Sequence, residues 1–194
     1  MIEISHLTKK FDQFVAIDDL SVSIREGEVL GFLGPNGAGK STTMKVITGF
    51  LSPSSGRVTI DGHDISTAAL EAKRLIGYLP EGAPSYGDMT TLEFLRFIAQ
   101  VRGFRGVEIE QKVDQVINEV ALQTVRDQSI ETLSKGFKRR VGLAQAIMHD
   151  PKVLILDEPT DGLDPNQKHH VRALIKSLAT DKIVIISTHI LEEV

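Results

Sequence analysis

The chain has 194 residues, of which 41% are hydrophobic and 25% charged, a composition that argues against an intrinsically disordered protein. Its formal net charge of −4 argues against a general nucleic-acid-binding protein, because such proteins usually carry an excess of basic residues. The absence of cysteine excludes disulfides, cysteine-ligated zinc and thiol catalysis. The length predicts one domain, and no apolar run approaches the roughly 20 residues that span a membrane.

The N-terminal part of the chain has the patterns of short strands. Apolar and polar residues alternate over residues 2–7 and 20–24, which predicts strands with one buried face. Two further strands are predicted over residues 29–33 and 57–60, and the second ends at the turn signal Asp61-Gly62. Because these strands follow one another closely, we expect a small antiparallel sheet at one edge of the fold.

Three runs are apolar throughout, at residues 30–33, 153–156 and 183–186. Strands of a parallel sheet have this pattern when helices cover both faces of the sheet, so all three runs are predicted to be buried. The stretch from about 85 to 150 is almost entirely helical in pattern. We therefore predict an α/β fold with a mainly parallel sheet, an N-terminal antiparallel β subdomain and an inserted helical subdomain at about 85–150.

Start signals and apolar stripes predict where helices lie. Thr90 and Glu93 have the spacing of a capping box, which predicts a helix that runs to about Val101. A stripe of apolar residues at positions 113–120 predicts a second helix, and Asp164-Pro165 is a typical start for a third. These helices flank the apolar runs, as an α/β fold requires.

Residues 34–41 read Gly-Pro-Asn-Gly-Ala-Gly-Lys-Ser and match the phosphate-loop pattern G-x-x-x-x-G-K-[ST] of P-loop NTPases at every fixed position. A predicted strand precedes the loop and a predicted helix follows it, which disfavours a glycine turn that merely contains Lys-Ser. Glycines allow backbone N–H groups to surround phosphate oxygens, and the helix start adds partial positive charge. We expect Lys40 to reach the β and γ phosphates, Ser41 to bind Mg²⁺ and Thr42 to donate to the α phosphate. The predicted nucleotide-binding residues of the loop are Gly34, Pro35, Asn36, Gly37, Ala38, Gly39, Lys40, Ser41 and Thr42.

The apolar run at 153–156 ends in two acids, Asp157 and Glu158. Ligands bind at the carboxyl ends of strands in open α/β sheets, so both acids are predicted to lie in a site. Asp157 is the candidate for holding Mg²⁺, through water, and Glu158 for polarising the water that attacks the γ phosphate. A general base of this kind typically contributes a factor of about 10²–10⁴ in rate. The alternative is that both acids are ordinary solvated residues after a core strand, and the presence of a phosphate loop in the same chain disfavours it.

A third candidate segment begins at Ser134, which is a good N-cap for a helix through residues 138–148. Gly136 allows a ligand to approach the backbone there, and such a helix start can bind phosphate. By itself, however, this pattern is more often an ordinary capped helix. The basic run Lys138-Arg139-Arg140 is expected to be a solvated helix face.

Together these motifs resemble those of the ATP-binding cassette (ABC) ATPases, the nucleotide-binding subunits of ABC transporters. The phosphate loop is similar to that of the family, LSKGF at 133–137 resembles its LSGGQ signature, and LILDEPTDGLDP at 154–165 resembles its acidic strand and D-loop. STH at 187–189 resembles its switch histidine. Order and spacing agree over nearly the whole chain, so the resemblance implies a single domain over 1–194. Cassettes of the family normally continue beyond the position of Val194, which implies a truncated chain.

The resemblance also implies roles for residues outside the loop. Phe11 stands where an aromatic residue stacks on adenine, the alternative being an ordinary core phenylalanine. Glu81 stands at the Q-loop position, where glutamine is usual, and Asp164 at the D-loop aspartate. His189 would contact the γ phosphate and the attacking water, beside Glu158. The implied ligands of Mg²⁺ are Ser41, Glu81 and Asp157.

In this family two cassettes hold two ATP molecules between them, head to tail. Ser134, Lys135 and Gly136 would therefore act in trans, on the ATP of a second nucleotide-binding subunit, identical or different. Lys135 replaces the first glycine of the signature and Phe137 its glutamine. LSKGFKRR, with GYLPE upstream, resembles the subgroup that serves exporters of drugs, lipids and polysaccharides and gliding-motility systems.

The function implied is ATP hydrolysis, with ATP and Mg²⁺ as cofactors, that powers a separate integral membrane permease from the cytoplasmic face of the cell membrane. No nucleic-acid partner is expected. The alternative is a non-transport cassette that acts on DNA or the ribosome, but Ser134 follows Lys40 by only 94 positions, which leaves no room for an inserted coiled coil. A nucleotide kinase or a GTPase is a weaker alternative, and the N-K-x-D loop of a GTPase is absent.

Overall fold

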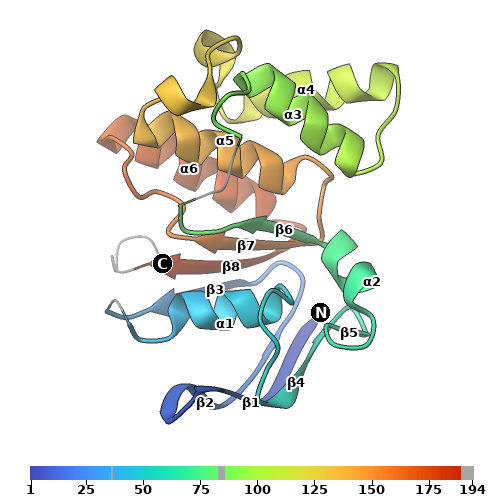
Figure 1. Cartoon of the computed structure of the whole chain (residues 1–194), viewed down its shortest axis with the longest axis vertical. Helices are drawn as coiled ribbons and strands as arrows, with labels where there is room; N and C mark the ends of the chain where they lie inside the picture. Colours follow the sequence, from blue (N-terminus) through green and yellow to red (C-terminus); the bar gives the residue numbers. More distant parts are fainter. Residues whose placement is uncertain (36, 83–85, 189–194) are drawn as a thin grey trace.

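The computed structural model describes residues 1–35, 37–82 and 86–188, and two sheets organise this part of the chain (Figure 1). The antiparallel sheet has the order β2-β1-β4-β5, and Ile2 of its central strand lies opposite both Ile24 and Ile60. All three isoleucines are buried, which confirms the predicted alternation of buried and exposed residues. The strands are β1 (Ile2–Phe11), β2 (Phe14–Ile24), β4 (Ser55–Ile60) and β5 (His63–Asp64).

The second sheet is parallel, with the order β3-β8-β7-β6. In its register Leu33 pairs with Thr188, Asp157 with Ser187, and Leu79 with Leu156. The carboxyl ends of all four strands therefore meet at one edge, where the phosphate loop and the acidic residues follow. The strands are β3 (Val29–Leu33), β6 (Ile76–Leu79), β7 (Val153–Asp157) and β8 (Ile183–Thr188).

Two hydrophobic cores lie on opposite faces of the parallel sheet. Leu154 and Leu156 of β7 pack into the core on the side of the helical segment, whereas Val153 and Ile155 pack into the core beneath the antiparallel sheet. Successive side chains of a strand point to opposite faces, so a strand that supplies two cores must be apolar at every position. This arrangement explains the uninterrupted apolar run at 153–156.

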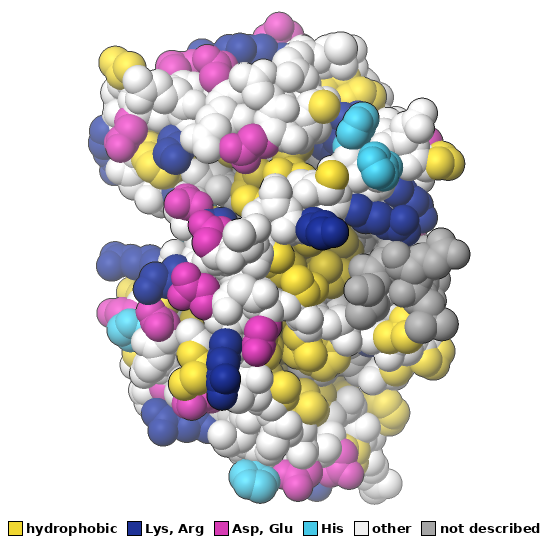
Figure 2. All heavy atoms as spheres, turned by 180° about the vertical axis from the view of Figure 1, so that it is seen from behind, with side chains coloured by type: hydrophobic (Ala, Val, Ile, Leu, Met, Phe, Trp, Pro, Cys, Tyr) yellow, Lys and Arg dark blue, Asp and Glu magenta, His cyan; other side chains and the backbone are white. Residues whose placement is uncertain are grey.

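The prediction that residues 30–33 are buried on both faces is wrong. Within the part of the chain that the structure describes, β3 is an edge strand that pairs with β8 alone. Val29 is 48% exposed and Leu33 is 47% exposed, whereas every residue of β7 and β8 is buried. Figure 2 shows apolar side chains gathered in the middle of the back of the molecule, with charged residues of both signs around them. An apolar run predicts a strand, but its position in the sheet decides its burial.

Helices cover both faces of the parallel sheet (Figure 1). The segment between β6 and β7 forms α3, α4 and α5 with two short 3₁₀ turns, and α6 lies beside α5 over the same face. The capping box between Thr90 and Glu93 is confirmed, as are the buried stripe of α4 and the start of α6 at Asp164-Pro165. No helix in the described ranges combines the length and the apolar character needed to cross a membrane. The helices are α1 (Lys40–Ile47), α2 (Ala69–Arg74), α3 (Thr91–Val101), α4 (Val107–Glu119), α5 (Lys135–Ile147) and α6 (Pro165–Leu178), and the 3₁₀ turns are Gln123–Val125 and Ile130–Thr132.

Candidate nucleotide-binding site

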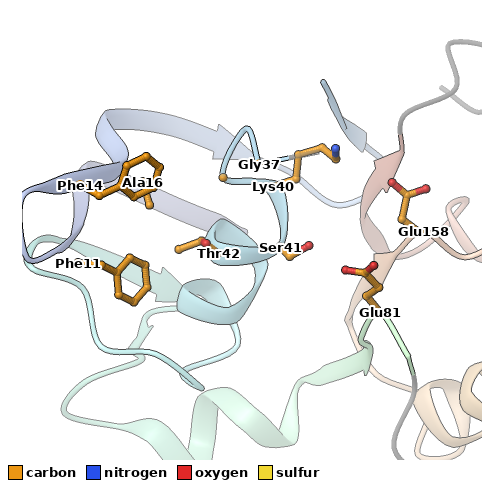
Figure 3. Close-up of a pocket in the computed structure, with 10 residues that line it drawn as sticks. Phe11, Phe14, Ala16, Gly37, Lys40, Ser41, Thr42, Glu81 and Glu158 are labelled. Carbon is orange, nitrogen blue, oxygen red and sulfur yellow. The ribbon is translucent and has the colours of Figure 1, made fainter. Parts of the chain in front are cut away.

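A cavity of about 460 Å³ opens at the edge where the parallel strands end (Figure 3). Aromatic side chains from the β1–β2 hairpin form one end of it, the phosphate loop forms the middle, and two carboxylates face the loop from the other end. The cavity is thus apolar at one end and charged at the other. Its lining residues are Phe11, Phe14, Ala16, Gly37, Gly39, Lys40, Ser41, Thr42, Glu81 and Glu158.

The phosphate loop can adopt its shape because two of its glycines have left-handed backbone conformations. Gly37 has a φ of 86° and Gly39 a φ of 88°, values that residues with a side chain rarely adopt. A Cβ on Gly39 would also overlap the carbonyl oxygen of Ala16 on β2. Gly39 is the N-cap of α1 and provides no side-chain cap, so the N–H groups of the first turn are left for other acceptors.

The side chain of Lys40 folds back over its own loop. Its Nζ donates to the carbonyl oxygens of Gly34, at 2.5 Å, and Pro35, at 3.1 Å. In Figure 3 this side chain extends toward the strand end that carries Glu158, and Ser41 also points to the carboxylate end. An ammonium group can exchange carbonyl oxygens for the more strongly charged phosphate oxygens at small geometric cost.

Asp157 is the last residue of β7, directly before Glu158, and is 1% exposed. Its Oδ1 accepts a hydrogen bond from Ser187 Oγ, whereas its Oδ2 has no hydrogen-bond partner within the described residues. A buried carboxylate oxygen without a donor is costly, and a hydrated cation would satisfy it. The residues present therefore fit Mg²⁺. Burial and the charge of Asp157 together raise the pKa of Tyr78 to about 12, so this phenol stays neutral beside the acids.

The backbone of Glu158 is held from two sides. Its φ is 52°, which is uncommon for a residue other than glycine. Its N–H donates to both the carbonyl oxygen and the Oγ of Ser187, each at 3.1 Å. Its carbonyl oxygen accepts from Arg139, at 3.0 Å from Nε and 2.7 Å from Nη2. These contacts direct the Glu158 side chain into the cavity opposite Lys40 (Figure 3).

The prediction that residues 138–140 form a solvated helix face is wrong for two of the three residues. Arg139 and Arg140 are each 8% exposed. Helix α5 packs against β6 of the parallel sheet and against helices α3 and α4, and α6 lies beside it, so most of its sides are covered. Burial lowers the pKa of Arg139, while the charges of Asp157, Asp161, Glu158 and Glu81 favour its cationic form. A basic run in the sequence does not show which side of a helix faces its neighbours.

Within the part of the chain that the structure describes, none of the residues of the signature-like segment lines the first cavity. Ser134 caps α5 by accepting from the N–H of Phe137 at 3.3 Å, and Asp164 caps α6 by accepting from the N–H of Gln167 at 2.9 Å. Lys135 Nζ lies 2.7 Å from Asp161 Oδ2. Lys135 lines a second cavity, of about 280 Å³, whose wall includes Glu81 and Glu158.

Two aromatic residues form the apolar end of the first cavity. Phe11 is 43% exposed, so it is not a core phenylalanine, and Lys9 Nζ lies 5.0 Å from the centre of its ring. Phe14, which pairs with Phe11 across the hairpin, was not predicted, although a second aromatic residue three positions after Phe11 was a usable signal. The predicted site residues Asn36 and His189 lie outside the described residues.

The chain is similar to known proteins of one family. The family model for ABC transporters matches residues 17–161. The chain is 36% identical, over its whole length, to the probable multidrug ABC transporter ATP-binding protein YbhF of Escherichia coli, of which it covers 34%. It is 34% identical, again over its whole length, to the Nod factor export ATP-binding protein I of Cupriavidus pinatubonensis, of which it covers 60%.

A solved structure has the same fold. The ATP-binding cassette MJ0796, as a dimer in a post-hydrolysis state bound to ADP and phosphate, superposes with a TM-score of 0.91 at 25% identity. The superposition covers all of this chain and 90% of that one. The match of the family model to most of the chain, together with this likeness, shows that the chain belongs to the ABC transporter family.

Proposed function

We propose that this chain is an ATP-binding and ATP-hydrolysing subunit that powers a separate membrane permease. The observation that carries the proposal is the first cavity, in which the phosphate loop faces Glu81 and Glu158 across a space with an aromatic end. ATP has the matching order of groups, an aromatic base, a sugar and a charged triphosphate. The names of the relatives and the ADP-bound state of the MJ0796 dimer support this assignment.

In the proposed complex, adenine stacks on Phe11 and the phosphates lie on the loop, with Lys40 at the β and γ phosphates. Ser41, Asp157 and Glu81 would hold Mg²⁺, and the Oδ2 of Asp157, which bonds none of the described residues, supports this role. The metal would supply positive charge that neutralises the phosphate oxygens. Glu81 in place of glutamine adds a negative charge at the carboxylate end, which a divalent cation would offset.

For hydrolysis, the Glu158 carboxylate accepts a proton from a water molecule as the water oxygen forms a bond to the γ phosphorus. The bond between that phosphorus and the β–γ bridging oxygen breaks, so the products are ADP and phosphate. His189 would contact the γ phosphate during this step. The backbone bonds of Glu158 to Ser187 and Arg139 support its role, because they hold the base in one position.

Ser134, Lys135 and Gly136 are proposed to act on ATP bound to a second subunit, identical or different, with Asp164 close to the interface. None of these residues lines the first cavity of its own chain, which supports this arrangement, as does the dimeric state of the similar MJ0796 cassette. Contacts that form only in the closed dimer favour the transition state over simple binding.

A mixing experiment tests this two-chain site. We expect Ser134→Arg to leave ATP affinity within about twofold, equivalent to roughly 0.4 kcal/mol, while abolishing cooperative hydrolysis. Lys40→Ala inactivates the phosphate loop instead. Mixing the two variants should restore part of the ATPase activity, because a mixed dimer combines the intact loop of the first with the intact signature of the second. Normal hydrolysis by Ser134→Arg alone at low protein concentration would show that the signature does not act in trans.

The permease is proposed because the relatives are transporter subunits, two of them named for multidrug transport and Nod factor export. We place the chain on the inner face of the cell membrane, without a nucleic-acid partner, in an exporter. If so, it should co-purify in detergent with the membrane protein encoded beside it, and that protein should change its ATPase rate. Stimulation by DNA or ribosomes in place of the membrane protein would contradict this assignment.

A further inference from the structure

We infer that Arg139 is a positioning residue that holds the Glu158 backbone and joins it to the segment carrying Glu81. This inference rests on the proposed ATPase function, since it concerns the geometry of the same site. Within the described structure, Arg139 makes no hydrogen bond to the side-chain carboxylate of Glu81 or of Glu158. It acts on the main chain next to them instead.

All three hydrogen bonds that the Arg139 guanidinium makes within the described residues go to backbone carbonyl oxygens, at two strand ends. Nε and Nη2 donate to the carbonyl oxygen of Glu158, at 3.0 and 2.7 Å. Nη1 donates to the carbonyl oxygen of Pro80, at 2.7 Å, and Pro80 follows β6 and precedes Glu81. One side chain of α5 thus joins the ends of β6 and β7, which are neighbours in the sheet.

The chemistry of these contacts requires arginine. The planar guanidinium presents donors on three separate nitrogens in a fixed fork, so it can bond two carbonyl groups that lie apart, whereas all the donors of lysine sit on one nitrogen. The side chain is 8% exposed, and water therefore has little access to replace it. Four carboxylates, those of Asp157, Asp161, Glu158 and Glu81, favour its positive charge.

Arg139 also lies close to the start of α5, which Ser134 caps. A displacement of this helix relative to the sheet would therefore move the carbonyl groups of Pro80 and Glu158. Glu158 is sensitive to such movement because its φ of 52° is held by external contacts. Arg139 accordingly makes the position of the proposed base depend on where α5 lies.

Arg140 is a matched control within the same helix. It is equally buried, at 8% exposure, and it also bonds backbone carbonyl oxygens. Its partners are Val120, at 3.3 Å, and Ala121, at 2.7 Å, both at the end of α4. Its guanidinium carbon lies 4.2 Å from the centre of the Phe137 ring. Substitution of Arg140 therefore removes the contacts of a buried arginine with the end of α4 and leaves the backbone contacts of Glu158 in place.

The test compares Arg139→Lys with Arg140→Lys in the full chain, measuring ATPase kinetics, ATP binding and amide hydrogen exchange without nucleotide. We expect Arg139→Lys to lower kcat by at least about tenfold with ATP affinity within about threefold, since a small misplacement of a catalytic group is costly to rate alone. Exchange should accelerate at residues 157–161 and 80–82. In Arg140→Lys, exchange should accelerate at 120–122, and kcat should stay within about threefold.

Three results would overturn the inference: a near-normal kcat in folded Arg139→Lys, equal losses of kcat in the two variants, or unchanged exchange at 157–161. A wild-type chain that does not hydrolyse ATP would refute the proposed function. The hydrogen-exchange data would still test whether Arg139 holds the backbone of Glu158. If Arg139→Lys does not fold, the inference can be tested on the wild-type chain by NMR. Its Arg139 Nε–H should exchange slowly by ¹⁵N NMR and shift on addition of ATP, and a fast-exchanging or unshifted signal would overturn the inference.

Discussion

Replacement of Glu158 by glutamine is expected to lower ATP turnover by a factor of about 10² or more while ATP binding persists. The amide keeps the size and shape of the side chain but cannot accept the proton of the attacking water. The backbone contacts of residue 158 with Ser187 and Arg139 do not involve the side chain, so they should remain. A loss of this size corresponds to roughly 2.7 kcal/mol of transition-state stabilisation.

Single-turnover ATPase assays, with ATP affinity measured by calorimetry, separate these effects. Glu119→Gln is the control for the same chemical change, because Glu119 lies at the exposed end of α4, away from the first cavity. Chelation of Mg²⁺ in the same assay should stop hydrolysis by the wild-type chain. Turnover at the wild-type rate in Glu158→Gln would mean that another group activates the water.

Lys40→Ala is expected to weaken ATP binding by about tenfold or more, equivalent to about 1.4 kcal/mol. The substitution removes the ammonium group that lies over the phosphate loop, where it now donates to the carbonyl oxygens of Gly34 and Pro35. Pro35 is exposed and Gly34 is half-buried, so water can replace the lost donor and the fold should persist.

Isothermal titration calorimetry measures this affinity, and thermal unfolding checks the fold. Lys45→Ala is the matched control, since Lys45 lies in the last turn of the same helix and does not line the cavity. We expect this control to bind ATP with the wild-type affinity. An unchanged affinity in Lys40→Ala would refute the assignment of residues 34–41 as a phosphate loop.

Local signals in the sequence predicted the parts of the site that depend on neighbouring residues. The phosphate loop needs left-handed glycines and a helix start, and both are requirements of a short segment, met at Gly37, Gly39 and α1. The two acids after 153–156 are placed by the strand that precedes them, since every strand of a parallel sheet ends at the same edge. Capping residues such as Thr90 and Asp164 likewise act within one turn of helix.

Other features could not be predicted because they depend on segments distant in the sequence. The β1–β2 hairpin reaches the phosphate loop, where the carbonyl oxygen of Ala16 occupies the space that a Cβ of Gly39 would need. Arg139 meets Pro80 and Glu158 across separations of 59 and 19 residues. No period or motif in the sequence records such meetings.

Patterns and spacing along the chain predicted the candidate residues: those proposed to hold phosphate, the acids that follow a buried strand, and the segments that form helices or strands. Which residues are exposed, and which segments they contact, depends on the tertiary structure. It made β3 an edge strand with exposed Val29 and Leu33, and it buried a basic residue, Arg139, that local pattern assigned to solvent. The physical reason is that burial is a property of packed elements. A side chain loses contact with water only when other segments cover it, and which segments do so depends on the order of strands in the sheet.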